Sequence, residues 1–292
     1  MENKKPEEND LSIIVCCHKQ DYYHKGAGFL PLQVGKANAK VDLGIQGDDT
    51  GDSISSKNPN FCELTGHYWL WKNGPHSKYI GLNHYRRYFD FSHKLPYGTN
   101  IFETTPQDIE KNFPTLPDLD KIFSKYDVIV AKPHIHSFCG AMHYRQYRIP
   151  NDLDILEGVI KEKYPEYWPS YYKIMYQNNK FSSCNMFIMK YDTFQDYSKW
   201  LFDLLFEVER RVHISQYSDQ ARIFGYMSEY LLNVYIYHNR LKAMKVPIAM
   251  VKDRLDNENN IRTYIKNFLI AIRYNLVHRL LFPRKSHYNP NI

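Results

Sequence analysis

The sequence predicts an α/β fold: a mixed sheet with a parallel core and helices on its faces. Three observations lead to this prediction. The composition is globular, with 43% hydrophobic and 24% charged residues. Short apolar runs rich in β-branched residues, which are typical of buried strands, recur along the chain. Segments of helical period separate these runs, and that alternation indicates a parallel sheet. We predict a single domain over residues 11–255.

The strands are expected where apolar runs stop at polar residues. The first is LSIIVCC at residues 11–17, and others are predicted at 41–45, 78–82, 126–131, 185–189 and 246–248. The segment between the first two strands contains Gly26, Gly28 and Pro31, and we expect it to be a loop.

The helices are expected where apolar residues recur at spacings of three and four. Phe61, Leu64, Tyr68 and Trp71 follow this spacing after Pro59, and they predict one helix that ends at 73–75. Further helices are predicted within 151–176, with interruptions at Pro165 and Pro169, and at 194–211 and 225–239.

The two ends of the chain differ from the rest. Residues 1–10 are polar and are predicted to be a disordered tail. Residues 256–292 are predicted to form a basic amphipathic helical segment, and residues 259–292 contain no Asp or Glu. Such a helix suits the interface of an anionic membrane, or packs on its own domain as an ordinary amphipathic helix. We favour an anionic membrane surface, bound through residues 259–285, because no acid interrupts the cations.

Composition and motifs exclude several classes of protein. No apolar stretch is long enough to span a bilayer, and no secretory signal is visible at the start. Five cysteines without framework spacing are expected to be reduced thiols in a cytoplasmic protein. Aromatics at 15% and a net charge of +6 suit sugars, nucleotides, phosphates or anionic membranes. Zinc, dinucleotide, Walker-type and GxSxG motifs are all absent.

Polar clusters follow three of the predicted strands, at 18–19, 46–55 and 83–88. Ligands of open α/β sheets bind at the carboxyl ends of strands, so the clusters predict a binding cleft. In the last cluster, His84, Arg86 and Arg87 leave one strand end together. Guanidinium groups bind phosphate bidentately and would stabilise a departing diphosphate. The alternative is a solvated basic turn, or ion pairs with local carboxylates.

Carboxylates in two settings are candidates for chemistry. Asp48, Asp49 and Asp52 lie in a loop, where they would bind ribose, a base or a cation, or would only form turns. Glu63 and Glu229 lie on predicted helices. Glu229 is surrounded by apolar residues, so burial would raise its pKa and suit it as a general base. Glu63 would otherwise be a solvated helix residue, and Glu229 would otherwise pair with a nearby arginine.

Longer blocks of sequence resemble a known family. Residues 47–58 (GDDTGDSISSKN) are followed by 61–73 (FCELTGHYWLWKN) and 79–89 (YIGLNHYRRYF), with later blocks at 185–189, 200–202 and 225–232. Together they resemble the bacterial capsular polysaccharide synthesis family that is catalogued as domain of unknown function 4422. The resemblance covers residues 11–250.

The resemblance implies a GT-A-like, Rossmann-like glycosyltransferase. Such an enzyme would move a hexose, galactose in its pyranose or furanose form, from a UDP-sugar to a lipid-linked oligosaccharide. The reaction would serve capsule, exopolysaccharide or O-antigen synthesis at the inner face of the bacterial cytoplasmic membrane. We expect the N-terminal half to bind the donor and the C-terminal half the acceptor.

Site residues can then be assigned within this interpretation. The expected nucleotide-sugar-binding residues are His18, Lys19, Gln46, Gly47, Asp48, Asp49, Asn58, His84, Arg86 and Arg87, and the expected acceptor-binding residues are Asn185 and Asp219. An inverting enzyme needs a carboxylate that deprotonates the acceptor hydroxyl. We expect Glu229 in this role, with Glu63 as the second choice.

One departure from GT-A enzymes concerns the metal ion. Those enzymes usually place Asp-x-Asp at the end of the strand after the nucleotide-binding half, where it holds Mn²⁺ or Mg²⁺. Here the strand at 79–82 runs into the basic cluster instead. We therefore expect no metal cofactor, with His84 and the two arginines neutralising the diphosphate. If Mg²⁺ or Mn²⁺ is required, Asp48, Asp49 and Asp52 are the candidate ligands.

Two other functions stay open. A non-catalytic carbohydrate-binding or polysaccharide-assembly protein would keep the aromatic surface but have no nucleotide affinity. A nucleic-acid binder would show a steep salt dependence. The central domain has no continuous basic stripe, which argues against nucleic acid.

Overall fold

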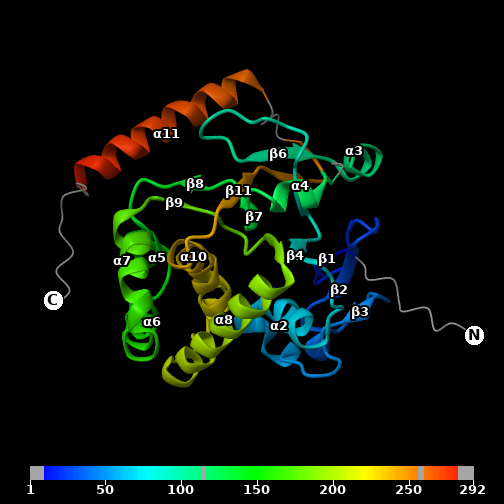
Figure 1. Ribbon diagram of the computed structural model, residues 1–292, viewed down its shortest axis with the longest axis horizontal. Helices are drawn as coiled ribbons and strands as arrows, with labels where there is room; N and C mark the ends of the chain where they lie inside the picture. The colour runs from blue at the N-terminus through cyan, green and yellow to red at the C-terminus, as the bar shows by residue number, and fades with distance from the viewer. Residues whose placement is uncertain (1–9, 114–115, 256–259, 282–292) are drawn as a thin grey trace, which may run out of the picture.

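The computed structural model describes residues 10–113, 116–255 and 260–281, and it shows a central sheet with helices on both faces (Figure 1). The main path of the sheet runs in the order β11-β7-β10-β4-β1-β2-β3. These strands are β1 (Leu11–Cys17), β2 (Phe29–Gln33), β3 (Gln46–Gly47), β4 (Tyr79–His84), β7 (Val128–Ala131), β10 (Phe187–Lys190) and β11 (Ala243–Val246). The predicted α/β fold with a mixed sheet is confirmed.

The direction of the strands fixes which loops share an edge of the sheet. β1 is parallel to both β2 and β4, whereas β10 is antiparallel to β4 and β7. The carboxyl ends of β1, β2 and β4 therefore lie at the same edge as the start of β10. This edge is where the predicted polar clusters begin.

Three further strands extend the sheet beyond β4. β5 (Arg87–Phe89) follows β4 after a tight turn, and it pairs with β12 (Ile248–Val251), which also pairs with β6 (Ile101–Thr104). Two short strands, β8 (His134–Ile135) and β9 (Lys180–Phe181), form a separate antiparallel pair.

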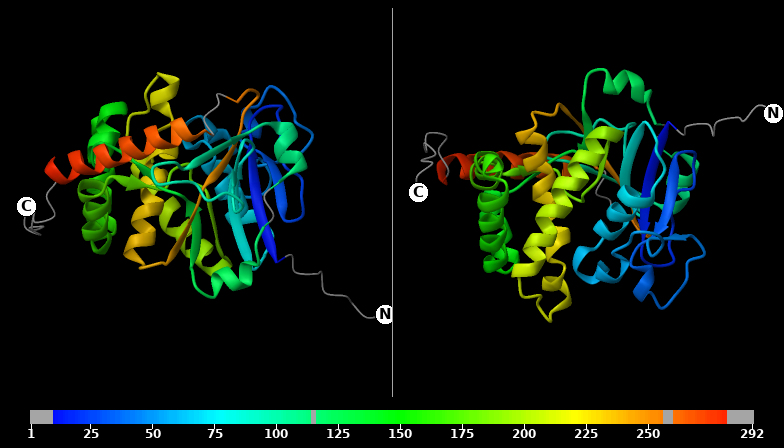
Figure 2. Two further views of the ribbon diagram at one scale, coloured as in Figure 1. Left: turned by 90° about the horizontal axis from the view of Figure 1, so that it is seen from above. Right: turned by 60° about the horizontal axis from the view of Figure 1, so that its bottom comes forward.

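Helices cover the two faces of the sheet unequally (Figures 1 and 2). The α-helices are α1 (Asn58–Phe61), α2 (Leu64–Asn73), α3 (Pro106–Lys111), α4 (Leu119–Phe123), α5 (Gly140–Tyr147), α6 (Pro150–Lys163), α7 (Trp168–Gln177), α8 (Tyr191–Arg211), α9 (Ser218–Ala221), α10 (Ile223–His238) and α11 (Ile261–Leu281). Short 3₁₀ helices are η1 (Lys36–Asn38), η2 (Ser55–Lys57) and η3 (Pro165–Tyr167).

The alternation of β1 side chains explains the two layers of core. Ile14 and Cys16 pack against α2, α5 to α8 and α10, in the larger apolar cluster. Ile13 and Val15 point to the opposite face, where α3, α4 and strands β5 and β12 cover them. Successive strand residues point to opposite faces, so a continuous apolar run is what a strand covered on both sides requires.

The second strand is not where the sequence pattern placed it. The expected strand at 41–45 is irregular, and the strand that pairs with β1 is β2, in the segment expected to be a loop. Pro31 lies inside β2, opposite Val15. The proline is tolerated there because β3 pairs only with Leu32 and Gln33, so the ladder on that side starts after it.

Two other predicted elements are divided in the structure. The single helix expected after Pro59 is broken at Cys62, between α1 and α2. The last strand expected at 246–248 is two strands, β11 and β12, separated by Pro247. The interruption expected at Pro165 is confirmed, because η3 separates α6 from α7. Pro169 does not interrupt a helix, because it lies in the first turn of α7, where proline is tolerated.

The ends of the chain are described in part. Residues 1–9 of the predicted tail lie outside the described residues. The predicted helical segment is present as α11, whereas its flanks at 256–259 and 282–292 lie outside the described residues. Among the residues described, no helix combines the length and apolarity needed to cross a bilayer.

Candidate active site

A cavity of about 990 Å³ opens at the edge of the sheet where β1, β2 and β4 end. This volume is at the upper end of the usual range for small-molecule sites. Seven of the predicted site residues line it, namely His18, Asn58, Glu63, His84, Arg86, Arg87 and Glu229. Residues from the amino and carboxyl halves of the chain therefore meet in one cavity, as ligand placement at strand ends predicts.

A break between two helices places Glu63 in the cavity wall. α1 ends at Phe61, and Cys62 has φ 53° and ψ −131°, a backbone conformation that L-residues rarely adopt. The side-chain amide of Asn58 donates to the Cys62 carbonyl oxygen at 2.7 Å and holds the break. Strained backbone of this kind concentrates at functional sites, where surrounding contacts maintain it.

Helix α10 reaches the same wall through a close approach at Gly225. A Cβ at this position would lie only 2.9 Å from the Sγ of Cys62, so a larger residue would push the helix away. Glu229 follows one turn later on α10 and lines the cavity with Glu63. The glycine therefore allows two carboxylates from separate helices to share one site.

A left-handed turn before β10 connects Glu229 to β4. Cys184 and Asn185 have φ angles of 71° and 51°, which are uncommon for consecutive residues other than glycine. The backbone N–H of Cys184 donates to Glu229 Oε1 at 2.9 Å, and its carbonyl accepts from His84 Nε2 at 2.6 Å. The unusual turn thus orients a carboxylate and an imidazole together.

Asn185 acts on the second carboxylate. Its side-chain amide donates to Glu63 Oε1 at 2.7 Å and to the Gly225 carbonyl at 3.0 Å. Asn185 was expected to bind the acceptor, but it is buried and does not line the cavity. Its contacts make it a residue that positions Glu63 against α10.

The environment of Glu229 suits it to accept a proton near neutral pH. Burial, followed by the negative charge of Glu63, raises the pKa of Glu229 from 4.5 to about 7. The hydrogen bond from Cys184 opposes this shift. Within the described residues Glu229 makes no ion pair, so the arginine partner considered from the sequence is not found. A general base is most effective when its pKa lies near the working pH.

The two adjacent arginines have different environments. Arg86 donates through Nε to Asp21 at 2.9 Å and through Nη2 to Asp253 at 2.8 Å. Arg87 also lines the cavity, and no residue in the described part of the chain forms an ion pair with it. Of the two arginines, only Arg86 is therefore bound by carboxylates within the described part of the chain.

The cavity favours the neutral form of its two histidines. Burial lowers the pKa of His18 and of His84, and nearby cations lower both further. His84 donates to a carbonyl, and the ring of His18 meets that of Tyr85 edge to face at 5.2 Å. When neutral, His84 has its single N–H engaged by the Cys184 carbonyl, so its other ring nitrogen can only accept a hydrogen bond. The positive charge expected of His84 stays a prediction.

The acidic loop uses its central carboxylate for its own structure. Asp48 is fully buried, and it accepts the backbone N–H groups of Gly35 at 2.9 Å and Lys36 at 3.1 Å. The hydroxyl of Ser55 also donates to it. Asp52 accepts from the hydroxyl of Tyr68 at 3.0 Å. These contacts explain the density of Asp and Ser without a ligand.

The remaining predicted residues lie outside the cavity lining. They are Lys19, Gln46, Gly47, Asp49 and Asp219. Lys19 is exposed and 3.6 Å from Asp21, while Asp219 accepts from Arg148 at 2.8 Å and from Tyr226 at 3.1 Å. Their assignments to the donor and the acceptor stay predictions.

The candidate metal ligands do not form a metal site by themselves. Asp48 is occupied by backbone donors, Asp49 is exposed, and Asp52 is bound to Tyr68. In the described ranges, no group of three or more His, Cys, Asp or Glu residues is placed to hold a metal ion.

Sequence reasoning missed part of the cavity wall. Arg222, Tyr226 and Lys252 line it, together with Cys62. Arg222 lies just before α10, donates through Nε to the Cys62 sulfur at 3.3 Å, and is exposed to solvent. The sequence did place Arg222 near Glu229, but that spacing suggested an ion pair between them. It did not indicate that the two side chains would line the same cavity separately. Lys252 could not be found, because its strand was placed too early.

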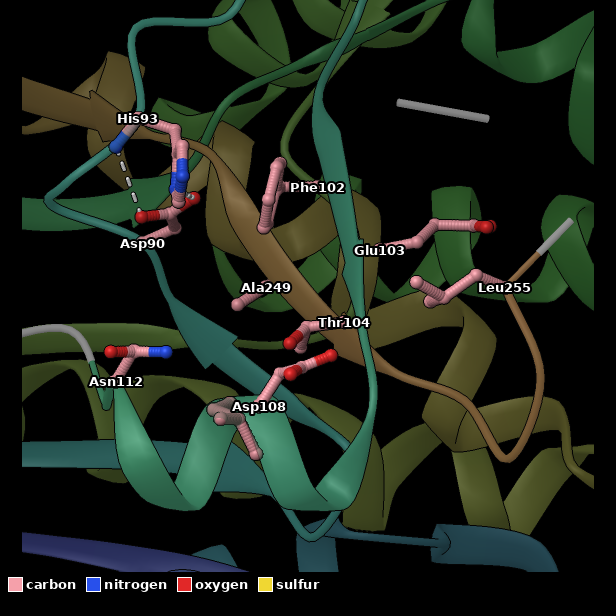
Figure 3. Close-up of a pocket in the computed structure, with 10 residues that line it drawn as sticks. Asp90, His93, Phe102, Glu103, Thr104, Asp108, Asn112, Ala249 and Leu255 are labelled. Atoms are coloured by element: carbon pink, nitrogen blue, oxygen red, sulfur yellow. Dashed lines mark hydrogen bonds and ion pairs between the residues drawn. The ribbon is translucent and has the colours of Figure 1, made fainter. Parts of the chain in front are cut away.

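A second cavity, of about 320 Å³, lies between α3 and strands β6 and β12 (Figure 3). Asp90, Glu103 and Asp108 line it, whereas no arginine or lysine does. Asp90 is buried and binds His93 through Nδ1 at 2.8 Å. Glu103 also forms an ion pair with Lys252. This cavity suits a diphosphate less well than the larger one, which Arg86, Arg87 and Arg222 line.

The fold and the larger cavity define a class: an α/β domain whose ligand site combines basic residues with two carboxylates at the carboxyl edge of the sheet. The chain belongs to the family described as Domain of unknown function (DUF4422), which it matches over residues 12–240. This confirms the resemblance noted in the sequence.

A solved structure extends the comparison. The chain is similar to the apo structure of WbbM, a bifunctional glycosyltransferase, with 31% sequence identity and a TM-score of 0.76. The similarity covers 84% of this chain and 46% of that one, so this chain spans about half the length of WbbM. No curated protein sequence matches the chain.

Proposed function

We propose that the protein is a GT-A-like glycosyltransferase that moves a hexose from a UDP-sugar to a glycan acceptor. The main support for the proposal is that Arg87 lines the same cavity as two carboxylates, Glu63 and Glu229. Similarity to WbbM, named a bifunctional glycosyltransferase, supports the class of reaction. In line with the family resemblance, the acceptor proposed is a lipid-linked oligosaccharide of a capsule, exopolysaccharide or O-antigen.

Arg87 is the residue proposed to hold the donor diphosphate. Its guanidinium has no ion pair among the described residues, so binding a phosphate does not require breaking one. Guanidinium and phosphate form bidentate, charge-assisted hydrogen bonds. Negative charge grows on the diphosphate as its bond to the sugar breaks, so Arg87 would bind the transition state more strongly than the ground state.

Glu229 is proposed to deprotonate the acceptor hydroxyl. The acceptor oxygen attacks the anomeric carbon, the bond from that carbon to the diphosphate oxygen breaks with its electron pair, and the proton moves to Glu229. The configuration of the sugar would then invert. Glu63, held by Asn185, keeps the pKa of Glu229 raised through its charge. Glu63 is the second candidate for the base itself.

The experiment that tests this function is UDP release from a panel of UDP-sugars, with and without soluble acceptor saccharides, in the presence of EDTA. We expect acceptor-dependent UDP release with one donor sugar. Activity that disappears with EDTA and returns with Mn²⁺ would contradict the metal-free interpretation.

A thermal shift separates the proposal from its main alternative. UDP should stabilise the folded protein if it binds the native cavity. A protein that binds oligosaccharides but shows no stabilisation by UDP would instead be a carbohydrate-binding or assembly protein.

A further inference from the structure

Helix α11 contacts the rest of the protein mainly through polar and small side chains, together with an edge-to-face contact between Phe268 and Tyr97 at 6.3 Å. Figures 1 and 2 show that α11 lies along the outside of the molecule. The amide of Asn267 donates to Thr99 at 3.3 Å, and that of Asn275 donates to the Tyr97 hydroxyl at 2.5 Å. Between them, Ala271 is buried. This asparagine-rich face is the one turned towards the domain.

Two further contacts define the same inward face. Gly98 has φ +86°, and a Cβ there would lie 2.5 Å from the carbonyl oxygen of Asn267, so the loop lies directly against the helix. About two turns beyond Ala271, His278 is buried and contacts the carbonyl of Gln177 through Nε2 at 3.3 Å. The orientation of α11 is thus set at several points along its length.

The opposite face of α11 is apolar and exposed. Its large apolar residues are Ile261, Ile265, Phe268, Leu269, Ile272, Leu276 and Leu280, and all of them are exposed. Ile261 is 69% exposed and Leu280 is 81% exposed. A surface helix of a globular protein normally turns its apolar stripe towards the core. In α11 the arrangement is the reverse, so the stripe is turned away from the domain.

The positive charges near the apolar stripe of α11 indicate which kind of partner this face would bind. Arg262, Lys266, Arg273 and Arg279 lie on the same helix, and residues 259–292 contain no acid. In a pair formed by two copies through this face, cations would meet cations with no carboxylate from either helix. The cations also keep α11 from crossing a bilayer. An anionic surface with an apolar interior fits both the charge and the stripe.

We propose that the outward face of α11 binds the surface of a membrane that contains anionic phospholipids. The helix lies in the plane of the interface, with Leu269 and Ile272 among the acyl chains and the cations among the headgroups. The inference goes beyond the transfer reaction, because the docking requires neither nucleotide nor acceptor. It would hold the domain at a surface where a lipid-linked acceptor is found.

Vesicle flotation of the full chain tests the proposal. The probes are phosphatidylcholine vesicles with and without phosphatidylglycerol. We expect binding to the anionic vesicles that weakens at high salt, where charges are screened. The double variant Leu269→Ser/Ile272→Ser and the triple variant Arg262→Gln/Lys266→Gln/Arg273→Gln should each lower that binding about tenfold or more.

The matched control is Tyr217→Ser, which removes an exposed aromatic residue far from α11 in sequence and should bind vesicles as the unaltered chain does. Helical content by circular dichroism and stabilisation by UDP should be the same in all variants, which separates this test from that of the transferase. Absence of vesicle binding, or binding that survives the double variant, would overturn the proposal. So would a dimer in solution that the double variant converts to a monomer.

Discussion

Two charged segments at the same edge of the sheet, the loop 47–55 after β3 and the stretch 85–89 after β4, differ in what their charges contact. In the loop, backbone N–H groups and a serine surround Asp48. In the second segment, Arg86 is held by two aspartates while Arg87 faces the cavity without an ion pair among the described residues. A cluster of charged residues after a strand therefore indicates the edge of the sheet where a ligand can bind. The hydrogen-bond donors and acceptors around each charged side chain decide whether it is available to that ligand.

The largest effect on activity is expected from removing the carboxylate of Glu229, which lines the cavity. Glu229→Gln keeps the size of the side chain but cannot accept a proton, so kcat should fall about 1,000-fold, within the usual contribution of a general base. Acceptor-dependent UDP release at saturating donor measures it.

The stability of this variant provides its control. Since the folded protein raises the pKa of Glu229 from 4.5 to about 7, ionising this group disfavours folding as the pH rises through that window. Glu229→Gln should therefore unfold at the same temperature or higher at pH 8. A variant that stays folded and retains kcat within tenfold would exclude Glu229 as the base.

The next effect concerns the two arginines directly. Arg87→Gln should lower kcat/KM about 10- to 100-fold, the loss expected for a charge-assisted hydrogen bond to phosphate. Arg86→Gln should lower kcat/KM less than about threefold but also reduce thermal stability, since Asp21 loses the closer of its two cationic partners. The reverse ranking of the two variants would show that the ion pairs of Arg86 open when donor binds.

In the loop 47–55, we expect a substitution to change the stability of the protein but not its catalytic activity. Asp48→Asn should lower the free energy of unfolding by about 2 kcal/mol, because an amide is a poorer acceptor for two buried backbone N–H groups. Asp49→Asn, at an exposed position, should change it by less than about 0.5 kcal/mol. Urea titration measures both. If Asp48→Asn is stable but no longer binds UDP, the loop belongs to the nucleotide site.

The smallest effect is a shift in the pH profile. kcat/KM should rise about tenfold per pH unit on the acid side and level off above about pH 7, where Glu229 is deprotonated. Glu63→Gln removes a negative charge that raises the pKa of Glu229, so the midpoint should move to lower pH. A midpoint that moves upward would mean that the two carboxylates do not interact as the structure indicates.

The sequence predicts most of the fold because its strands are covered on both faces. Continuous apolar runs such as 11–17 identify these strands even when the neighbouring strands in the sheet are unknown. β2 was missed because Pro31 and nearby glycines are typical of loops, and only the short length of β3 makes the proline compatible with pairing. That information depends on a neighbouring strand and is absent from the local sequence.

The site was predicted less completely, for a physical reason of the same kind. Both candidate carboxylates and both arginines were found from residue type and position. What the sequence does not show is the backbone that connects them, with positive φ angles at Cys62, Cys184 and Asn185. Nor does it show that the carboxylate of Asp48 accepts hydrogen bonds from the backbone N–H groups of Gly35 and Lys36. Contacts between remote segments decide both points.

We propose that Arg87, and not Arg86, binds the diphosphate of the donor without a metal ion. Calorimetric titration with UDP and with uridine, in EDTA, tests it most directly on the unaltered chain, Arg87→Gln and Arg86→Gln. We expect UDP to bind more tightly than uridine, and we expect Arg87→Gln to remove most of this difference while Arg86→Gln preserves it. An undiminished preference for UDP in Arg87→Gln would contradict this role for Arg87.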